Sequence, residues 1–322
     1  MNGPCVMVTG ATGFVGQALV RHLADAMPVI AAGRGQTRAA HWPAGVSYRP
    51  VGDVARGVFA PDTFEGVGTV VHAAARVHVM HERVPDPLAA FREVNVQGTL
   101  ALARRCVEHG VRRFVFISSV KVNGEHTTGR GPFRPDEPPA PEDAYGQSKW
   151  EAEQGLWQLA QETGLEVVVV RPVLVYGPGV GANFARMLQW LRRGMPLPLG
   201  AVHNQRSLVS LGNLCSLIAA CVVQPAAAGQ TFFASDGQDL STSDLLLRLG
   251  IALGKPARLL PVPVGCLLLL ARLAGKGAQA QRLLGSLQVS IEANHRLLGW
   301  APVEDQAQAL RATAAYFTVG QS

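Results

Sequence analysis

The feature that most constrains the fold of this chain is a strand, a glycine turn and a helix in direct succession near the N-terminus. Residues 5–8 are apolar and rich in β-branched side chains, which predicts a buried strand. Thr9-Gly-Ala-Thr-Gly-Phe-Val-Gly16 follows, and residues 18–23 then place apolar side chains at helical spacing. This order predicts the first half of a βαβ unit.

The three glycines of this turn each have a physical task in such a unit. Gly10 permits the tight turn, Gly13 lets the backbone approach a pyrophosphate, and Gly16 allows close packing of the helix on the strand. The helix N-terminus offers unpaired N–H groups and a partial positive charge to phosphates. We therefore expect a bound dinucleotide here, against the alternative of a glycine-rich turn in another kind of α/β protein.

Strand-like and helix-like patterns alternate through the first half of the chain. The predicted strands cover residues 5–9, 28–32, 46–50, 69–72, 113–118 and 166–171, and the longest helices cover 86–109 and 144–163. This alternation predicts a Rossmann-type, doubly wound parallel sheet. After Pro172 the rhythm breaks into Gly/Pro-rich connections and leucine-rich helices. We expect a dinucleotide-binding domain at 1–172 and a smaller α/β substrate-binding domain at 173–322.

Composition limits the classes of partner. A net charge of +6, with scattered arginines and no basic tract interleaved with aromatics, predicts no nucleic-acid surface. The five cysteines lack paired spacing, which indicates reduced thiols, no metal site and a cytoplasmic protein. Residues 262–274 are the most apolar stretch, but Pro263, Gly265 and Arg272 interrupt it and it is too short to span a bilayer. A packed helix is the favoured interpretation, with peripheral membrane contact left open.

Tyr145 and Lys149 are the candidates for proton transfer. Four residues apart in a predicted helix, they lie on one face. An ammonium beside a phenol favours the phenolate, so we expect Lys149 to lower the pKa of Tyr145. Such a tyrosine can give a proton to a carbonyl or take one from an alcohol.

Together these motifs resemble the extended short-chain dehydrogenases/reductases, and within them the nucleotide-sugar epimerases and dehydratases. The motifs that carry the resemblance are Thr9–Gly16, Asp53, His72–Ala75, Asn95, the serine strand 114–119, Tyr145 with Lys149, Arg171–Pro178 and Leu298–Pro302. The resemblance implies that some strands after residue 172 return to the first sheet. It also implies a homodimer built through the helices 86–109 and 144–163.

The resemblance implies the following site residues. The cofactor would contact Gly10, Gly13, Phe14, Val15, Gly16, Arg34, Asp53, Val54, Ala73, Tyr145, Lys149 and Pro172. The catalytic group would be Ser119, Tyr145 and Lys149, and the substrate would contact Ser119, Asn183, Arg206 and Arg282. Successive side chains of a strand point to opposite faces, so Ser118 and Ser119 point in opposite directions. Ser119 is the preferred catalytic serine. For two of these residues a structural role is nearly as plausible as substrate binding: Asn183 as the N-cap of a helix and Arg282 as a surface charge.

The end of the second predicted strand indicates the cofactor. NAD-binding chains usually have an acidic residue there to hold the ribose 2′-hydroxyl. This chain has Ala32-Gly33-Arg34-Gly35, and Arg34 could pair with a 2′-phosphate. The sequence thus favours NADP over NAD, with a solvated loop arginine as the alternative.

The expected reaction is reduction of the C4 keto group of a nucleotide-linked sugar, UDP-linked and 6-deoxy-N-acetyl, in bacterial surface polysaccharide biosynthesis. Val120-Lys121 replaces the Asp-Glu pair of the dehydratases, which argues against dehydration. Alternatives are a UDP-hexose 4-epimerase with tightly held NAD, a reductase of non-nucleotide ketones or steroids, and a non-catalytic dinucleotide sensor.

Overall fold

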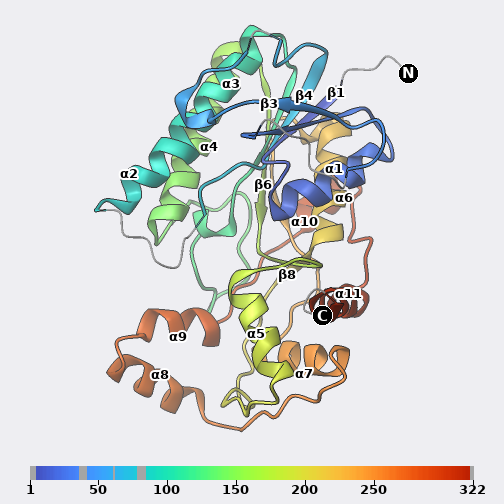
Figure 1. Cartoon of the computed structure of the whole chain (residues 1–322). Helices are drawn as coiled ribbons and strands as arrows, with labels where there is room; N and C mark the ends of the chain where they lie inside the picture. The colour runs from blue at the N-terminus through green and yellow to red at the C-terminus, as the bar shows by residue number, and fades with distance from the viewer. Residues whose placement is uncertain (1–4, 36–41, 61, 78–84, 320–322) are drawn as a thin grey trace.

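The centre of the molecule is a seven-stranded parallel sheet. The computed structural model describes residues 5–35, 42–60, 62–77 and 85–319. In spatial order the strands are β3 (Ser47–Pro50), β2 (Val29–Gly33), β1 (Cys5–Thr9), β4 (Val67–His72), β5 (Arg113–Ile117), β6 (Glu166–Pro172) and β9 (Thr231–Ala234). The predicted Rossmann-type fold is confirmed (Figure 1).

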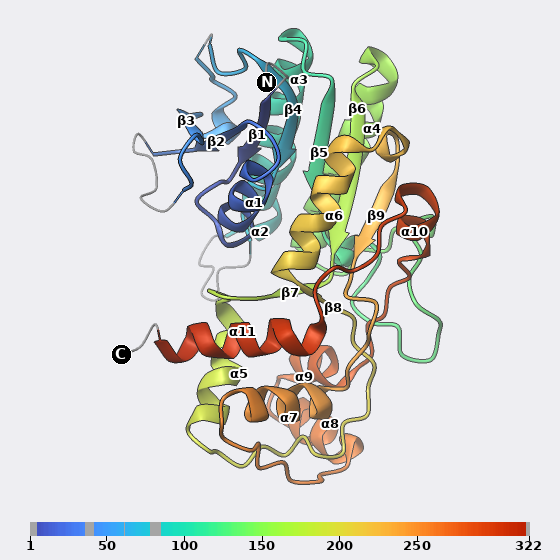
Figure 2. The same cartoon turned by 90° about the vertical axis from the view of Figure 1, so that its right-hand side faces the viewer.

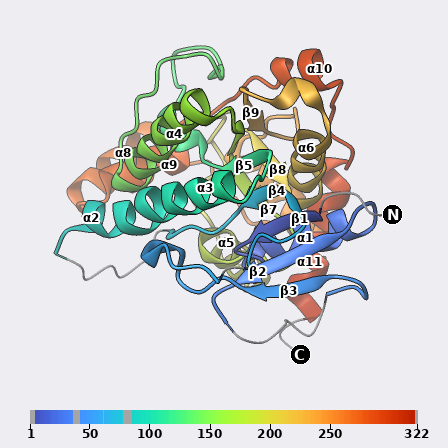
Figure 3. The same cartoon turned by 90° about the horizontal axis from the view of Figure 1, so that it is seen from above.

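Helices cover both faces of the sheet, as the view from above shows (Figure 3). One face carries α1 (Phe14–Ala24) and α6 (Leu211–Val223), and the other carries α2 (Pro87–Phe91), α3 (Thr99–Glu108) and α4 (Ala144–Thr163). Helix α4 has the predicted bounds. The predicted helix 86–109 is divided, because the π-helical segment Arg92–Gly98 lies between α2 and α3.

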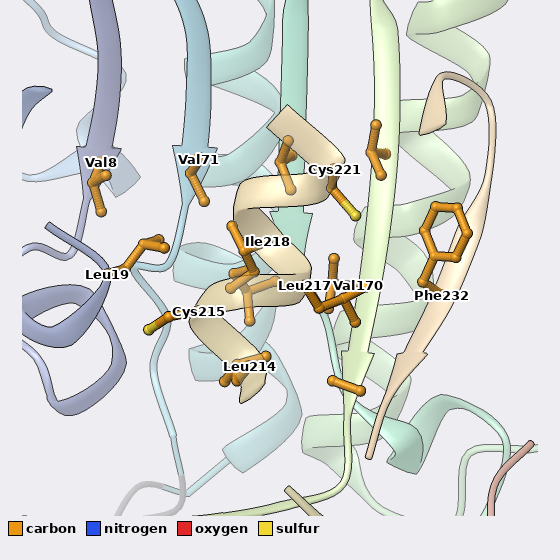
Figure 4. Close-up of a cluster of buried hydrophobic side chains, with 14 of the residues drawn as sticks. Val8, Leu19, Val71, Val170, Leu214, Cys215, Leu217, Ile218, Cys221 and Phe232 are labelled. Atoms are coloured by element: carbon orange, nitrogen blue, oxygen red, sulfur yellow. The ribbon is translucent and has the colours of Figure 1, made fainter. Parts of the chain in front are cut away.

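The C-terminal half contributes directly to the central sheet. Strand β9 pairs with β6, and α6 packs beside α1 on the sheet. Figure 4 shows Leu214, Leu217, Ile218 and Cys221 of α6 directed at the strands and at Phe232 of β9. All five side chains are fully buried, so α6 and β9 complete the core of the sheet.

A smaller helical layer lies below the carboxyl ends of the strands (Figure 2). It contains the two-stranded parallel sheet β7 (Leu174–Tyr176) and β8 (Leu208–Ser210). Its helices are α5 (Ala182–Arg192), α7 (Thr242–Ala252), α8 (Val264–Leu273), α9 (Gly277–Leu284) and α11 (Gln306–Val319), while α10 (Glu292–Leu298) lies near β9. Three 3-10 turns, η1 (Val54–Arg56), η3 (Val120–Val122) and η4 (Pro225–Ala227), complete the list.

The expectation for the apolar stretch 262–274 was half right. It forms the helix α8, yet none of the side chains of α8 is buried. The packed-helix interpretation holds only in part: α8 packs on α9 with Leu267 and Leu268 half-buried, but its other leucines face solvent. Among the described residues, no helix is both long and apolar enough to span a membrane.

Candidate active site

The glycine turn after β1 has the backbone geometry that its sequence predicts. Gly10 has φ +68°, and a Cβ at this position would lie 2.6 Å from the Ala74 nitrogen. A Cβ on Gly16 would lie 2.1 Å from the Gly10 carbonyl oxygen. Both positions therefore exclude any side chain, and the turn brings the start of α1 against the ends of β1 and β4.

The start of α1 fits a dinucleotide phosphate. Gly13 is the N-cap and provides no side-chain hydrogen bond to the first turn of the helix. A Cβ on Gly13 would meet only the Gly10 oxygen, at 3.3 Å, so the exposed side of the turn is open. Phe14 and Val15 are half-buried in the first turn. The backbone N–H groups of this turn can donate hydrogen bonds to a pyrophosphate.

The other predicted cofactor residues lie at the carboxyl ends of neighbouring strands. Arg34 follows β2 and is exposed, Ala73 follows β4, and Pro172 ends β6. Asp53 follows β3 and caps η1, accepting a hydrogen bond from the Ala55 nitrogen at 3.1 Å, while Val54 is buried. In open α/β sheets ligands bind outside the carboxyl ends of the strands, which is where these residues lie.

Tyr145 sits in the first turn of α4. Asp143 caps this helix by accepting a hydrogen bond from the Gly146 nitrogen at 2.7 Å. The ring of Tyr145 meets Phe91 edge-on, with ring centroids 5.9 Å apart. Burial, and then the nearby Asp143 carboxylate, raise the pKa of Tyr145.

Lys149 is fully buried one turn further along α4. Its Nζ donates to the Ile117 carbonyl oxygen at 2.8 Å and lies 4.4 Å from the centre of the Phe116 ring. Burial lowers the pKa of Lys149 to about 7, although the Glu153 carboxylate opposes the shift. The lysine is thus close to half ionised at neutral pH.

These directions correct the expectation that Lys149 lowers the pKa of Tyr145. In the protein alone the pKa of Tyr145 is raised, because the desolvated lysine does not offset the burial of the phenol. An oxidised nicotinamide bound here would supply a hydride acceptor together with a positive charge, and that charge would favour the phenolate of Tyr145.

Ser119 is brought to the same corner by η3. It caps η3, and its Oγ accepts a hydrogen bond from the Lys121 nitrogen at 3.3 Å. A Cβ on Gly146 would lie 2.7 Å from the Lys121 oxygen, so η3 packs directly on the first turn of α4. Ser119 and Tyr145 are therefore held by two segments in direct contact, and Ser119 is only half-buried.

A buried polar network lies behind this corner, and its members were not predicted as site residues. The Ser118 hydroxyl donates to Glu153, which also accepts from Nε of Arg171 at 3.0 Å. Arg171 donates further to Asn123 Oδ1 at 2.9 Å. The one sequence signal was a glutamate four residues after Lys149, on the face of α4 that the tyrosine and lysine occupy.

Two residues quoted for the resemblance have positioning roles. Asn95, in the π-helical segment, accepts from the Arg76 nitrogen at 2.8 Å and donates to Ser148 Oγ at 3.0 Å. His72 contacts Thr9 Oγ1 at 2.7 Å and Thr99 Oγ1 at 3.1 Å. Burial and the charge of Lys149 lower the pKa of His72 to about 3, so the imidazole is neutral.

The predicted substrate residues do not form one cluster of contacts. Arg206 donates to the carbonyl oxygens of Arg282 at 2.6 Å and Gly285 at 3.1 Å, at the end of α9. The Arg282 guanidinium pairs with Glu125 and lies 4.0 Å from Asp143. Arg282 therefore has partners and is not an isolated surface charge. Asn183 is exposed and lies within the first turn of α5. It is not the N-cap of this helix, because Gly181 occupies that position.

Comparison with known proteins decides the family. The model of the NAD dependent epimerase/dehydratase family matches residues 6–232. The chain belongs to this family. A "UDP-glucose 4-epimerase" of Vibrio cholerae is 44% identical over 97% of this chain and 95% of its own length.

Two more distantly related proteins are also similar to this chain. The "N-acetyl-alpha-D-glucosaminyl-diphospho-ditrans,octacis-undecaprenol 4-epimerase" of Escherichia coli O157:H7 is 29% identical over 84% of this chain and 81% of its own. The UDP-glucuronic acid 4-epimerase of Bacillus cereus, solved with NAD, superposes with a TM-score of 0.79 at 18% identity, over 99% of this chain and 100% of its own. This last likeness concerns the fold.

Proposed function

We propose that this protein is a 4-epimerase of a UDP-linked hexose. The observation that carries the proposal is the 44% identity to the Vibrio cholerae enzyme named for that reaction, over nearly the whole of both chains. The corner formed by Ser119, Tyr145 and Lys149 supports it, because it offers two hydroxyl groups and a buried amine at the same edge of the sheet as the glycine turn. In this proposal Tyr145 takes the proton of the sugar C4 hydroxyl and later returns it to the same oxygen. A bound dinucleotide would take the hydride from C4 and give it back to the opposite face of the carbonyl.

The other site residues have supporting tasks in this proposal. Ser119 hydrogen-bonds the same sugar oxygen, and Lys149 positions the cofactor ribose. Gly10, Gly13, Gly16, Asp53 and Pro172 bind the dinucleotide, and Arg206 with Arg282 bind the substrate diphosphate. Arginine suits this last task through its charge and fork geometry. Residues 1–172 would bind the cofactor and 173–322 the sugar.

A second candidate is the C4-keto reduction that the sequence favoured. The observation in its favour is the end of β2, where no acidic residue follows and the exposed Arg34 could pair with the 2′-phosphate of NADP. A reductase consumes NADPH, whereas an epimerase keeps its cofactor bound. The two candidates therefore differ in the nucleotide that they hold.

One experiment separates the candidates. The nucleotide released from denatured, freshly purified protein is identified, and UDP-glucose and UDP-galactose are then incubated separately with the enzyme. Retained NAD with interconversion of the two sugars is the expected result. Oxidation of added NADPH by a UDP-4-keto sugar, without interconversion, would replace the epimerase by the reductase. No turnover in either assay would leave the dinucleotide sensor.

We further propose a homodimer through the helical face of α2, α3 and α4. The Arg92–Glu151 ion pair, with Nη2 and Oε1 2.6 Å apart, joins the π-helical segment to α4 and makes this face one continuous surface. Light scattering should give twice the mass of the chain. A monomeric mass at micromolar concentration contradicts the proposal.

A further inference from the structure

Helix α8 presents an apolar face to solvent. Cys266, Leu269, Leu270 and Leu273 follow the spacing i, i+3, i+4 and i+7, so they form one stripe along the helix. All four side chains are exposed, and the three leucines retain 59%, 62% and 78% of their accessible surface. We call these four residues the leucine face.

A surface helix usually buries its apolar stripe and turns a polar face to solvent, but α8 is apolar both on its half-buried side, with Leu267 and Leu268, and on its exposed side. Leu260 before α8 and Leu283 on α9 are also about half exposed. Single exposed leucines are ordinary, but a contiguous apolar patch marks an interaction site. The α8–α9 pair projects at the lower edge of the molecule, away from the central sheet (Figures 1 and 2).

The charge of this region identifies the kind of partner. Residues 245–291 contain no aspartate or glutamate and six basic residues: Arg248, Lys255, Arg258, Arg272, Lys276 and Arg282. Of these, Arg282 is already paired with Glu125 and lies near Asp143. Arg272 and Lys276 are both exposed, directly beside the end of the leucine face. Leucines flanked by positive charge match a bilayer that contains anionic lipids. A second copy of the chain, related by a two-fold axis, would bring the same positive charges together.

We propose that the leucine face of α8 docks this protein on an anionic membrane surface. The ten residues of α8 are about 15 Å long, so the helix lies in the interface and does not cross the bilayer. The leucines enter the boundary between headgroups and acyl chains, and Arg272 and Lys276 contact lipid phosphates. The docking is reversible, because it rests on one short helix and no lipid anchor.

The docking surface is connected to the candidate active site. Helix α9 packs on α8 and carries Arg282, whose Nε donates to Glu125 in the loop after η3. Glu125 also pairs with Lys121, 3.1 Å away, two residues after Ser119. Docking thus holds the substrate side of the site beside the bilayer. This consequence rests on the proposed function, whereas the docking itself does not.

Vesicle flotation with the full-length protein tests the proposal without any activity assay. Vesicles of phosphatidylglycerol and phosphatidylcholine should carry the wild-type protein to the top of a density gradient, and pure phosphatidylcholine should carry less. The double variant L270Q/L273Q should partition at least about tenfold less. The matched control is I251Q/V303Q, which removes two side chains of similar exposure, 74% and 69%, outside α8 and should float as the wild type does.

Two further measurements address charge and orientation. Arg272→Gln and Lys276→Gln should each reduce partitioning about fivefold on anionic vesicles and little on neutral ones. An environment-sensitive dye on Cys266, in a Cys5→Ser background, should shift to shorter wavelength when vesicles are added, because Cys266 lies on the leucine face. A dye on Cys266 that does not respond overturns the orientation and with it the proposal.

Three other outcomes overturn the docking. The wild-type protein stays at the bottom of every gradient, or L270Q/L273Q floats as well as the wild type. In the third outcome, the wild type is dimeric and does not float, whereas L270Q/L273Q is monomeric in light scattering. That result would show that a second copy of the chain, and not a membrane, covers the leucine face. Thermal unfolding verifies that each variant is folded. We expect all of them to fold, because the substituted residues are exposed.

Discussion

Lys149 donates a hydrogen bond to the carbonyl oxygen of Ile117, at 2.8 Å, at the point where β5 ends. This bond ties the lysine to the strand that leads into Ser119, so the helix and the strand of the site are fixed relative to each other. It is also made by an amine that burial partly deprotonates, since the pKa of Lys149 falls to about 7.

The buried lysine makes stability depend on pH. Its pKa is lower in the folded protein than in the unfolded chain, so between about pH 7 and 10.5 the unfolded chain binds more protons. The free energy of unfolding should therefore rise with pH in this window, with a slope of about 1.4 kcal/mol per pH unit from this group. Urea unfolding of wild type and Lys149→Met at pH 7, 8 and 9 measures the difference. If the free energy of unfolding changes equally with pH in the two proteins, Lys149 is not the group responsible for the pH dependence.

Tyr145→Phe should reduce kcat by about 10²- to 10⁴-fold, because the site loses its proton carrier. Tyr176→Phe is the matched control. The Tyr176 hydroxyl donates to Asp236 Oδ2 at 2.8 Å inside the smaller core, so its loss should cost about 1–3 kcal/mol of stability and little of kcat. Steady-state kinetics and thermal unfolding separate the two effects. Full turnover by Tyr145→Phe would point to the dinucleotide sensor.

Gly16→Ala should destabilise the protein by at least about 3 kcal/mol, because the new Cβ would overlap the Gly10 carbonyl oxygen, 2.1 Å away. Gly131→Ala is the control, since no atom lies within 4 Å of a Cβ placed there. Denaturant unfolding in the absence of cofactor measures both variants. A difference below about 1 kcal/mol between them would show that the turn can relax.

The buried ion pair behind the site offers a comparison within one helix. Glu153→Gln leaves Arg171 buried beside a neutral partner and should cost about 3–5 kcal/mol of stability. Glu151→Gln, two residues away, breaks the exposed pair with Arg92 and should cost at most about 1 kcal/mol. Similar losses in the two variants would mean that the Arg171 network is hydrated.

Arg34→Asp tests the choice of cofactor. The aspartate can accept a hydrogen bond from the ribose 2′-hydroxyl and repels a 2′-phosphate, so the ratio of affinities for NADP over NAD should fall by at least about tenfold. Fluorescence titration with each nucleotide gives the ratio. Arg104→Asp, at an exposed position of α3, is the control and should leave the ratio unchanged. An unchanged ratio in Arg34→Asp would remove this residue from the cofactor site.

The sequence predicted six of the seven strands and the helix α4, because both show in the period of their apolar residues. It did not locate β9, which lies far along the chain from the other strands. The network of Glu153, Arg171 and Asn123 was not predicted, since it joins residues far apart in the chain. The direction of the Tyr145 pKa was wrong for a related reason: spacing places Lys149 on the right face but does not show that burial dominates its charge.

The return of the chain to the central sheet has a consequence for how the protein can be divided. Cutting after Pro172 would separate the glycine turn from β9 and α6, which lie against β6 and α1. The N-terminal fragment would then expose the edge of β6 and the apolar face of the sheet that α6 covers, and both would favour aggregation. We therefore expect the part of the chain predicted to bind the cofactor to be stable only when residues up to 234, the end of β9, are also present.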